Sequence, residues 1–362
     1  MLAVTQRRTF WILARTDAKD LVRDKLTAAS MLTLALVLLV IHTTMWLAFS
    51  VAGDAPRIAA STAVAPLSPE LAAALAPFAV TPGAQPNTRV DVADGRVAIT
   101  MLEPGVGWDP LWQSLRAAGV PAGSIDTLEG DGEPMPDFLR LNLGTEFLAA
   151  LAAIALIGTA VPLVAARERG MLRLLGTTPL PRWLFLASRV PARLLLVFVS
   201  AAAIAAIALG RRYMDAAALP RFAVTVACAS VMLFGVGALF SARARNAEAT
   251  QQVMAGLALA LVFTAGAVFP PALLPAPARV AVGVLPGSWV AQAAGADLAG
   301  LPPVLPVPAY WGLMLAVGAT CAWIAARRFR WDGAPPTTAA PPAAAPTTAQ
   351  ATTPQTREAT RT

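Results

Sequence analysis

The residues best suited to specific contacts lie in one charged stretch between two long apolar runs, at residues 165–181. An apolar strip there runs beside charges. The strip is Met171, Leu172, Leu174 and Leu175, and the charges are Glu168, Arg169 and Arg173. Such a strip can seat in a groove of a partner while the charges fix its orientation, which predicts a protein-docking element. The alternative is a membrane-surface loop whose arginines only set the topology.

Polar side chains at or inside the apolar runs are the second group of candidates. His42, the only histidine, lies in the first run, and an ionisable group inside a membrane is a functional candidate. A neutral imidazole hydrogen-bonded to a neighbouring helix is the other interpretation. Glu146, at the outer mouth of the second run, either lines a vestibule or recognises a cation, or it is an interfacial carboxylate in water. Gln251 and Gln252 open the fifth run and either face a translocation pathway or hold helices together.

Motifs of the common catalytic sites do not occur in the sequence. A glycine-rich phosphate loop is missing, since neither of the two lysines, Lys19 and Lys25, follows a glycine. The His-Glu-x-x-His and Gly-x-Ser-x-Gly patterns are also missing. Cys228 and Cys321 fall inside apolar runs, which argues against a disulfide framework or a metal cluster. We therefore expect no catalytic, metal-binding or cofactor-binding residue in this chain, and no enzyme activity of its own.

The composition is that of a membrane protein. Hydrophobic residues make up 57% of the 362 residues and charged residues only 14%, whereas a soluble protein is about 45–50% apolar. A span needs about 20 apolar residues. Six uncharged runs can each supply one: 26–53, 147–166, 194–210, 222–241, 249–278 and 298–326. Prolines limit the last two spans to 249–269 and 310–326. We expect an all-α integral membrane protein with six transmembrane helices.

The basic residues indicate the orientation. With both termini in the cytoplasm, 17 Lys and Arg side chains ahead of the tail lie inside and nine outside, as the positive-inside rule requires. Arg211, Arg212 and Arg221 argue against this topology, because they flank a short loop that it places outside. The net charge of +7 thus reflects membrane topology, and we expect no nucleic-acid partner.

The rest of the chain divides into distinct regions. Residues 1–25 place apolar residues at helical spacing among charges, which predicts an interfacial helix on the inner membrane surface; a cytoplasmic extension of the first span, 26–53, is the alternative. Residues 54–140 carry 11 acidic and five basic residues and predict a small mixed α/β extracytoplasmic domain. Residues 141–330 hold the other spans, and the Pro-, Ala- and Thr-rich residues 331–362 predict a disordered tail.

Two motifs resemble those of type-2 ABC transporter permeases. Residues 167–179, Arg-Glu-Arg-Gly-Met-Leu-Arg-Leu-Leu-Gly-Thr-Thr-Pro, resemble the coupling loop of that family, although Met171 and Arg173 depart from its usual Thr and acidic residue. Farther along, a proline-rich stretch resembles the outer end of the family's fifth span, where the chain re-enters the membrane as short helices. Its matching residues are Gly266, Phe269, Pro270, Pro275 and Pro286. Residues 13–24 are similar to the family's N-terminal elbow helix.

The resemblance implies a function. In this family the coupling loop, here 167–189, docks on a separate ATPase subunit that binds the ATP, and the re-entrant segment, here 269–300, seals the outer end. The docking residues would be Glu168, Arg169, Gly170, Met171, Leu172, Leu174, Leu175 and Pro179. The resemblance also implies a second permease subunit, identical or related, and export across the cell membrane of a lipid-like, drug-like, glycan or peptide substrate.

Two other classes of function are compatible with the sequence. A membrane receptor or scaffold would bind partners through the outer domain and the cytoplasmic loop. A secondary transporter is the third option, but the spans contain few buried charges for ion coupling and no internal repeat is visible. The sequence does not identify the substrate.

Overall fold

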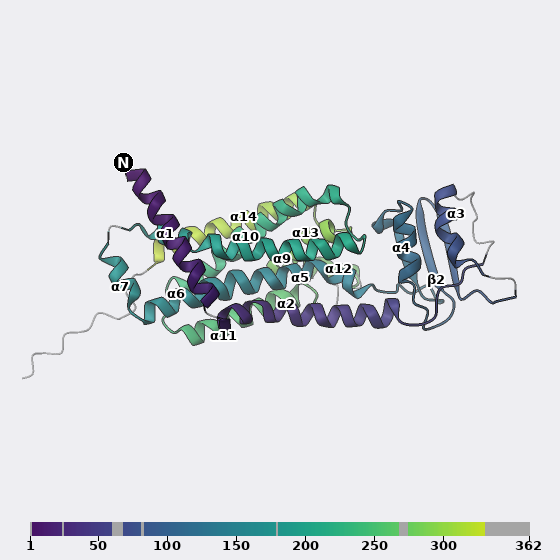
Figure 1. Ribbon diagram of the computed structural model, residues 1–362, viewed down its shortest axis with the longest axis horizontal. Coiled ribbons are helices and arrows are strands. Elements are labelled where there is room, and N and C mark those ends of the chain that lie inside the picture. Colours follow the sequence, from purple (N-terminus) through teal and green to yellow (C-terminus); the bar gives the residue numbers. More distant parts are fainter. Residues whose placement is uncertain are drawn as a thin grey trace, which may run out of the picture.

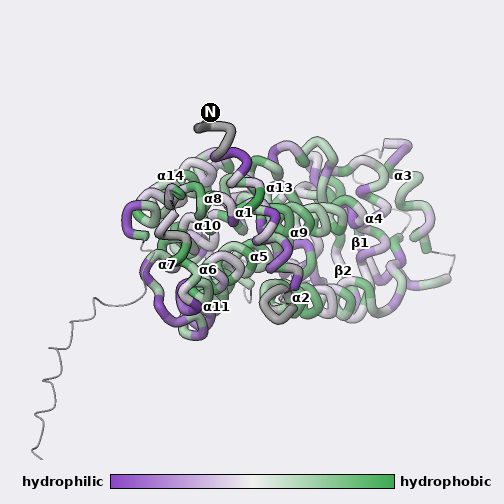
Figure 2. Tube along the Cα trace, turned by 60° about the vertical axis from the view of Figure 1, so that its left-hand side comes forward, coloured by the Kyte–Doolittle hydropathy of each residue, from purple (hydrophilic) through white to green (hydrophobic). Residues whose placement is uncertain are grey.

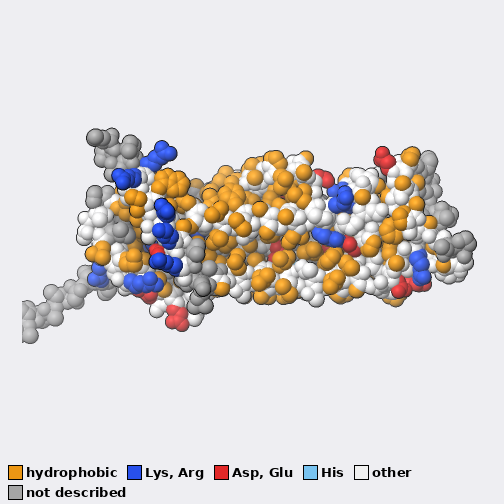
Figure 3. All heavy atoms as spheres, in the orientation of Figure 1, with side chains coloured by type: hydrophobic (Ala, Val, Ile, Leu, Met, Phe, Trp, Pro, Cys, Tyr) orange, Lys and Arg blue, Asp and Glu red, His pale blue; other side chains and the backbone are white. Residues whose placement is uncertain are grey.

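The computed structural model describes residues 2–23, 25–59, 68–80, 83–178, 180–267 and 274–329. The molecule is an elongated bundle of roughly parallel helices with a small sheet-containing domain at one end, and the N-terminal helix crosses the other end (Figure 1). A broad apolar band separates the two ends, which both carry charged side chains (Figure 3). The expected tail, 331–362, lies outside the described residues, as do Pro179, Phe269 and Pro270.

Helices of 11 or more residues form the bundle, and shorter ones lie at its ends. The bundle helices are α1 (Leu2–Arg23), α2 (Lys25–Trp46), α5 (Phe138–Ala152), α6 (Gly158–Glu168), α9 (Val190–Gly210), α10 (Leu219–Ser241), α11 (Ala247–Thr264), α13 (Pro286–Ala299) and α14 (Val307–Arg328). The shorter helices are α7 (Met171–Gly176), α8 (Arg182–Ser188) and α12 (Ala276–Gly283). Hydrophobic residues dominate along the bundle, and hydrophilic residues gather near α7 and at the ends of the bundle (Figure 2).

The small domain is built on a three-stranded sheet. Its order is β1 (Thr88–Ala93), β2 (Arg96–Met101), β3 (Ile125–Leu128), with β1 and β2 antiparallel and β2 and β3 parallel. The helices α3 (Pro69–Leu75) and α4 (Asp109–Ala117) complete the domain. Its core includes Trp108 and Trp112, both buried. The domain is therefore a mixed α/β unit inserted between α2 and α5.

Five helical segments are long and apolar enough to cross a membrane. They are Met31–Val51, Phe138–Glu168, Trp183–Gly210, Ala216–Ser241 and Val307–Arg328. The expected fifth of six spans, α11, is not among them, because Glu248, Gln251 and Gln252 make the first turns of this 18-residue helix polar. Within the described residues, five segments thus meet the length and composition of a span, where the sequence predicts six.

The segment Phe138–Glu168 is the central helix of the bundle and consists of α5, a π-helical turn and α6. Of its most apolar stretch, 89% is buried inside the protein, against 11% for Met31–Val51 and 22% for Val307–Arg328. Small residues allow neighbours to approach closely. A Cβ atom on Gly144, for example, would clash with the backbone of Ala291 in α13. The central helix therefore contacts protein on nearly all sides.

A proline creates one polar contact of the central helix. Pro162 lies inside α6 and has no N–H to donate to the carbonyl oxygen of Gly158. The π-helical turn Ala153–Ile157 directly precedes this position. The free carbonyl accepts a hydrogen bond from Nε of Arg193 in α9, and the same guanidinium pairs with Asp17 of α1. Arg193 thus joins α1 and α9 to the proline-containing turn.

Substitution of Gly144 by alanine tests the packing of α5 against α13. The added Cβ would meet a backbone carbonyl, which cannot rotate away as a side chain can, so we expect a loss of about 1–3 kcal/mol. The measurement is the midpoint of thermal unfolding of the purified protein. Gly312→Ala is the control, because open space surrounds that position and alanine favours a helix. Equal midpoints for both variants would contradict this close packing.

Candidate functional site

The α7 end of the central helix is fixed by its last charged residues. Arg167 is buried and donates hydrogen bonds to three carbonyl oxygens at the end of α10. The acceptors are Ser241 at 2.9 Å, Ala242 at 3.2 Å and Ala244 at 2.5 Å. Carbonyls at a helix C-terminus lack donors within the helix, so Arg167 caps α10. Glu168 accepts a hydrogen bond from the N–H of Ala247, at the start of α11, at 2.9 Å.

The apolar residues of α7 are divided between the interior and the surface. Gly170, with φ of +74°, ends α6 in the left-handed region that favours glycine. Leu172 is fully buried in a small apolar cluster that also contains Leu163, Ala166, Phe185 and Phe329. Met171 and Leu174 are 48% and 73% exposed, and the side chain of Leu175 is outside the described part. The strip expected from the sequence is therefore not continuous, because Leu172 anchors α7 to the bundle.

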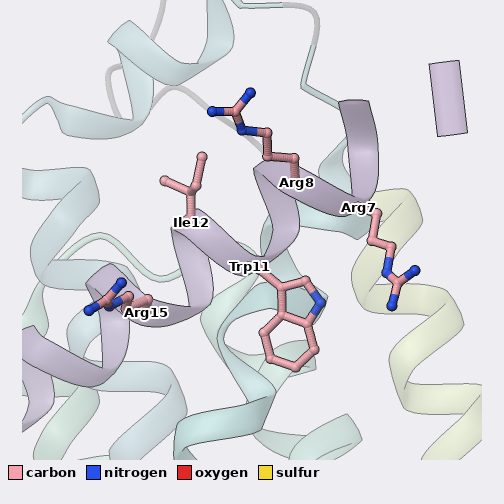
Figure 4. Close-up of a pocket in the computed structure, with 5 residues that line it drawn as sticks. All are labelled: Arg7, Arg8, Trp11, Ile12 and Arg15. Carbon is pink, nitrogen blue, oxygen red and sulfur yellow. The ribbon is translucent and has the colours of Figure 1, made fainter. Parts of the chain in front are cut away.

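Charges lie next to the exposed residues of α7. Glu168, Arg169 and Arg173 are all exposed. Another surface of mixed character lies on α1, where Trp11 and Ile12 are each 57% exposed and three arginines flank them (Figure 4). Those arginines are Arg7, Arg8 and Arg15. The α7 end of the bundle thus presents apolar side chains within a basic surface.

A buried polar pair lies in the half of the bundle nearer the small domain. Nδ1 of His42 in α2 is 2.5 Å from Oε1 of Glu146 in α5, and the side chains are only 3% and 2% exposed. Nε2 of His42 is 3.1 Å from the carbonyl oxygen of Ala267, just after α11. Glu146 is therefore not a carboxylate in water. The pair joins α2, the central helix and the segment that follows α11.

The geometry fixes how many protons the pair holds. The carbonyl of Ala267 can only accept, so Nε2 of His42 carries a hydrogen. At 2.5 Å a further proton must lie between Nδ1 and Oε1, since two facing lone pairs would repel. Whether that proton is assigned to the imidazole or to the carboxyl group of Glu146, the pair has no net charge.

The other residues singled out in the sequence lie elsewhere. Gln251 and Gln252 are exposed near the start of α11, away from the buried pair. Gly266 follows α11 with φ of +102°, Pro275 precedes α12 and Pro286 begins α13. Among the described residues, no group of three or more His, Cys, Asp or Glu side chains is placed to hold a metal ion.

The turn between α9 and α10 holds the small domain on the bundle. Arg211 pairs with Asp109 of α4, and Arg116 of α4 pairs with Asp215 at 2.8 Å. Arg116 also donates to the carbonyl oxygen of Arg212 at 2.7 Å. Of the arginines that oppose the expected topology, Arg211 thus pairs with the small domain through its side chain, and Arg212 contacts it through its backbone carbonyl.

The remaining arginine of that group has a similar role. Arg221 of α10 pairs with Asp297 of α13, which also accepts a hydrogen bond from Thr225 at 2.8 Å. This contact fixes α13 to α10 at the same end of the bundle. Sequence reasoning missed these partners, because an ion pair between residues 76 positions apart leaves no local pattern.

Burial changes the ionisation of two groups beneath the small domain. Burial raises the pKa of Asp137, although the hydrogen bond that it accepts from the N–H of Arg140 opposes this rise. Burial, together with the negative charge of Asp137, raises the pKa of Tyr213. The folded state therefore favours the protonated Asp137. Its contribution to stability is present at low pH and is lost as the pH rises through the pKa of the folded state.

Comparison with known families identifies the bundle. Residues 120–327 match the family model described as ABC-2 family transporter protein, which is more than half of the chain. The chain belongs to the ABC-2 transporter family. A search of curated proteins gave no match. The protein is thus an ABC-2 type permease, a membrane component of a transporter.

The match covers the central helix and the helices α7, α8, α12 and α13. It begins after α4 and ends within the last turn of α14. The helices α1 and α2, and with them His42, lie outside it. Their likeness to family features stays a prediction.

A double-mutant cycle on His42 and Glu146 tests their coupling. His42→Leu or Glu146→Leu alone leaves a buried polar partner, and we expect each to cost about 3–5 kcal/mol. The double variant should cost less than the sum, with a coupling of about 1–3 kcal/mol. Thermal unfolding of the purified variants measures this. Gln252→Leu, at an exposed position, is the control. Strictly additive losses would mean that the two side chains do not interact.

Proposed function

We propose that this chain is the membrane-spanning half of an ABC exporter, powered by a separate ATPase subunit that docks on α7. The observation that supports this proposal most is the arrangement of α7. Leu172 is buried and attaches the helix to the bundle, while Met171 and Leu174 are exposed among charged residues. Exposed apolar side chains at a polar surface favour a protein partner.

The connections of α7 support a mechanical role. The helix directly follows the central helix, and Arg167 and Glu168 fix that junction to the ends of α10 and α11. A displacement of α7 would therefore act on the central helix and on two further helices together. At its other half the central helix carries Glu146, which contacts His42. A load applied by the ATPase would thus reach the polar pair along one continuous helix.

The proposed topology places both termini in the cytoplasm and the small domain outside the cell. The excess of arginine at the α7 end supports it, and ion pairs with Asp109 and Asp297 account for two of the three arginines that oppose it, Arg211 and Arg221. In this proposal α11 is the fifth of six spans, since it packs along the central helix despite its polar first turns. A second permease subunit, identical or related, would complete the pathway, as the family resemblance implies. The family resemblance favours export over import.

Leu174→Asp tests the docking surface. The site is 73% exposed in the chain alone, so folding and membrane insertion should be unaffected. An unpaired carboxylate buried at an interface costs at least about 1–3 kcal/mol, or about tenfold for each 1.4 kcal/mol. We expect at least a tenfold weaker association with the ATPase subunit that copurifies from native membranes, and a matching loss of transport-coupled ATP hydrolysis.

Leu102→Asp is the matched control, because Leu102 is an exposed leucine of the small domain. It should retain wild-type association. If Leu174→Asp also retained wild-type association and coupled hydrolysis, α7 would be a surface loop that only sets topology. If no ATPase copurified with the wild-type chain, the receptor or scaffold alternative would be favoured.

A further inference from the structure

A small cavity lies beside α12 and α13, at the end of the bundle that carries the small domain. Its volume is about 150 Å³, and α5, α12, α13 and the segment after α13 contribute its walls. The walls are mostly apolar, with Leu141, Ala265 and Leu301 among them. A cavity of about this volume accommodates a benzene-sized group. The space therefore suits a headgroup with its first methylenes, and not a whole lipid.

One wall of the cavity carries a positive charge. Arg279 of α12 makes no ion pair with any residue that the structure describes. Its Nη2 donates to the carbonyl oxygen of Leu274 at 3.2 Å, and its Nε is buried without a partner. The adjacent residues 268–273 contain no acidic side chain. The guanidinium thus keeps donors for a ligand.

The nearby carboxylates are already engaged. Glu146 binds His42, and Asp297 pairs with Arg221. Neither acidic group is placed to neutralise Arg279. An uncompensated arginine in an apolar wall is costly, and an anion in the cavity would offset this cost.

A second donor points to the same class of ligand. Oε1 of Gln292 accepts hydrogen bonds from the N–H of Val304 at 2.9 Å and from the hydroxyl of Tyr310 at 2.8 Å. These contacts fix the amide so that its Nε2 is the free end, and this atom is buried without a partner. Thr145 adds a hydroxyl to the lining. Three side chains thus offer hydrogen-bond donors, and none of them is a carboxylate.

We propose that this cavity binds the anionic head, a phosphate or carboxylate, of an amphiphile in the outer half of the membrane. Arg279 neutralises the head, and Gln292 and Thr145 donate hydrogen bonds to it. The apolar part of the ligand follows the exposed residues next to the cavity on α12 and at its end, Val280 and Val284, which are 55% and 67% exposed. The mixed lining and this apolar rim favour an amphiphile over a free ion.

The cavity is adjacent to the buried polar pair. Thr145 lines the cavity and the next residue, Glu146, contacts His42; Ala265 lines the cavity and Ala267 accepts from the same histidine. A ligand in the cavity would therefore contact α5 and the end of α11, two of the segments that the pair joins. Binding of the head does not depend on the proposed ATPase partner, so the test uses the permease chain alone.

The test measures binding of dodecyl phosphate to the purified full-length chain in an uncharged detergent, by native mass spectrometry. We expect saturable binding of one equivalent. Arg279→Gln should weaken it at least tenfold, and Arg279→Lys, which keeps the charge, should weaken it less. Arg57→Gln is the control, since Arg57 is an exposed arginine of the small domain and should bind as the wild type does. Gln292→Leu, checked for an unchanged elution profile, should also weaken binding.

Three outcomes would overturn the proposal. The first is equal affinity of the wild type and Arg279→Gln for dodecyl phosphate. The second is equal affinity of the wild type for dodecyl phosphate and for dodecyltrimethylammonium, which would show that only the alkyl chain binds. The third is inorganic phosphate filling the site as tightly as dodecyl phosphate, which would identify a free-anion site and not an amphiphile site.

Discussion

The burial of one helix by its neighbours is the constraint on which the rest of the structure depends. The central helix, Phe138–Glu168, is surrounded by protein over most of its length, so its charged groups cannot be left to water or lipid. Each of them contacts a different element: Arg140 binds the carbonyl oxygens of Ala122 and Ala299, Glu146 binds His42, and Arg167 caps α10. Even the carbonyl freed by Pro162 is satisfied from α9. The polar groups of this helix are therefore also the connections between the parts of the molecule.

These connections give the bundle two organised ends. At the α7 end, Arg167 and Glu168 bring α10 and α11 together, and Asp17 attaches α1 to Arg189 and Arg193 of the third span. At the opposite end, the polar pair, the cavity and the small domain meet within a few turns of α5. A central helix that is packed on all sides can transmit a displacement between these ends, whereas an exposed helix would dissipate it into lipid. We propose that the two ends are coupled, so that a displacement of α7 changes the contacts around Glu146.

Much of this architecture is predictable from the sequence, because long apolar runs and the placement of arginine are strong signals. The same reasoning locates the coupling stretch and His42 as candidates. The sequence does not predict the burial of a side chain where that burial depends on which face of a helix packs against protein. Leu172 and Leu174 are indistinguishable in the sequence, yet one is buried and the other exposed. Glu146 lies at the mouth of an apolar run, where water is its simplest partner, and only the approach of α2 and the end of α11 buries it. The ion-pair partners of Arg211 and Arg221 lie far away in the chain, so the sequence does not reveal them. Five segments qualify as spans instead of the expected six, because three polar residues lie in the first turns of α11.

The central claim, that α7 and the outer polar pair are mechanically coupled, is tested most directly by a distance measurement across the pair. Spin labels at Thr43 of α2 and at Thr264 at the end of α11, both exposed, would be introduced after replacement of Cys228 and Cys321, the free cysteines among the described residues. Pulsed electron spin resonance on the complex with its ATPase would compare the nucleotide-free state with the state trapped by a non-hydrolysable ATP analogue. The account predicts a shifted distance distribution on trapping, and loss of that shift in Leu174→Asp. Identical distributions in both states, with the ATPase bound and active, would contradict it.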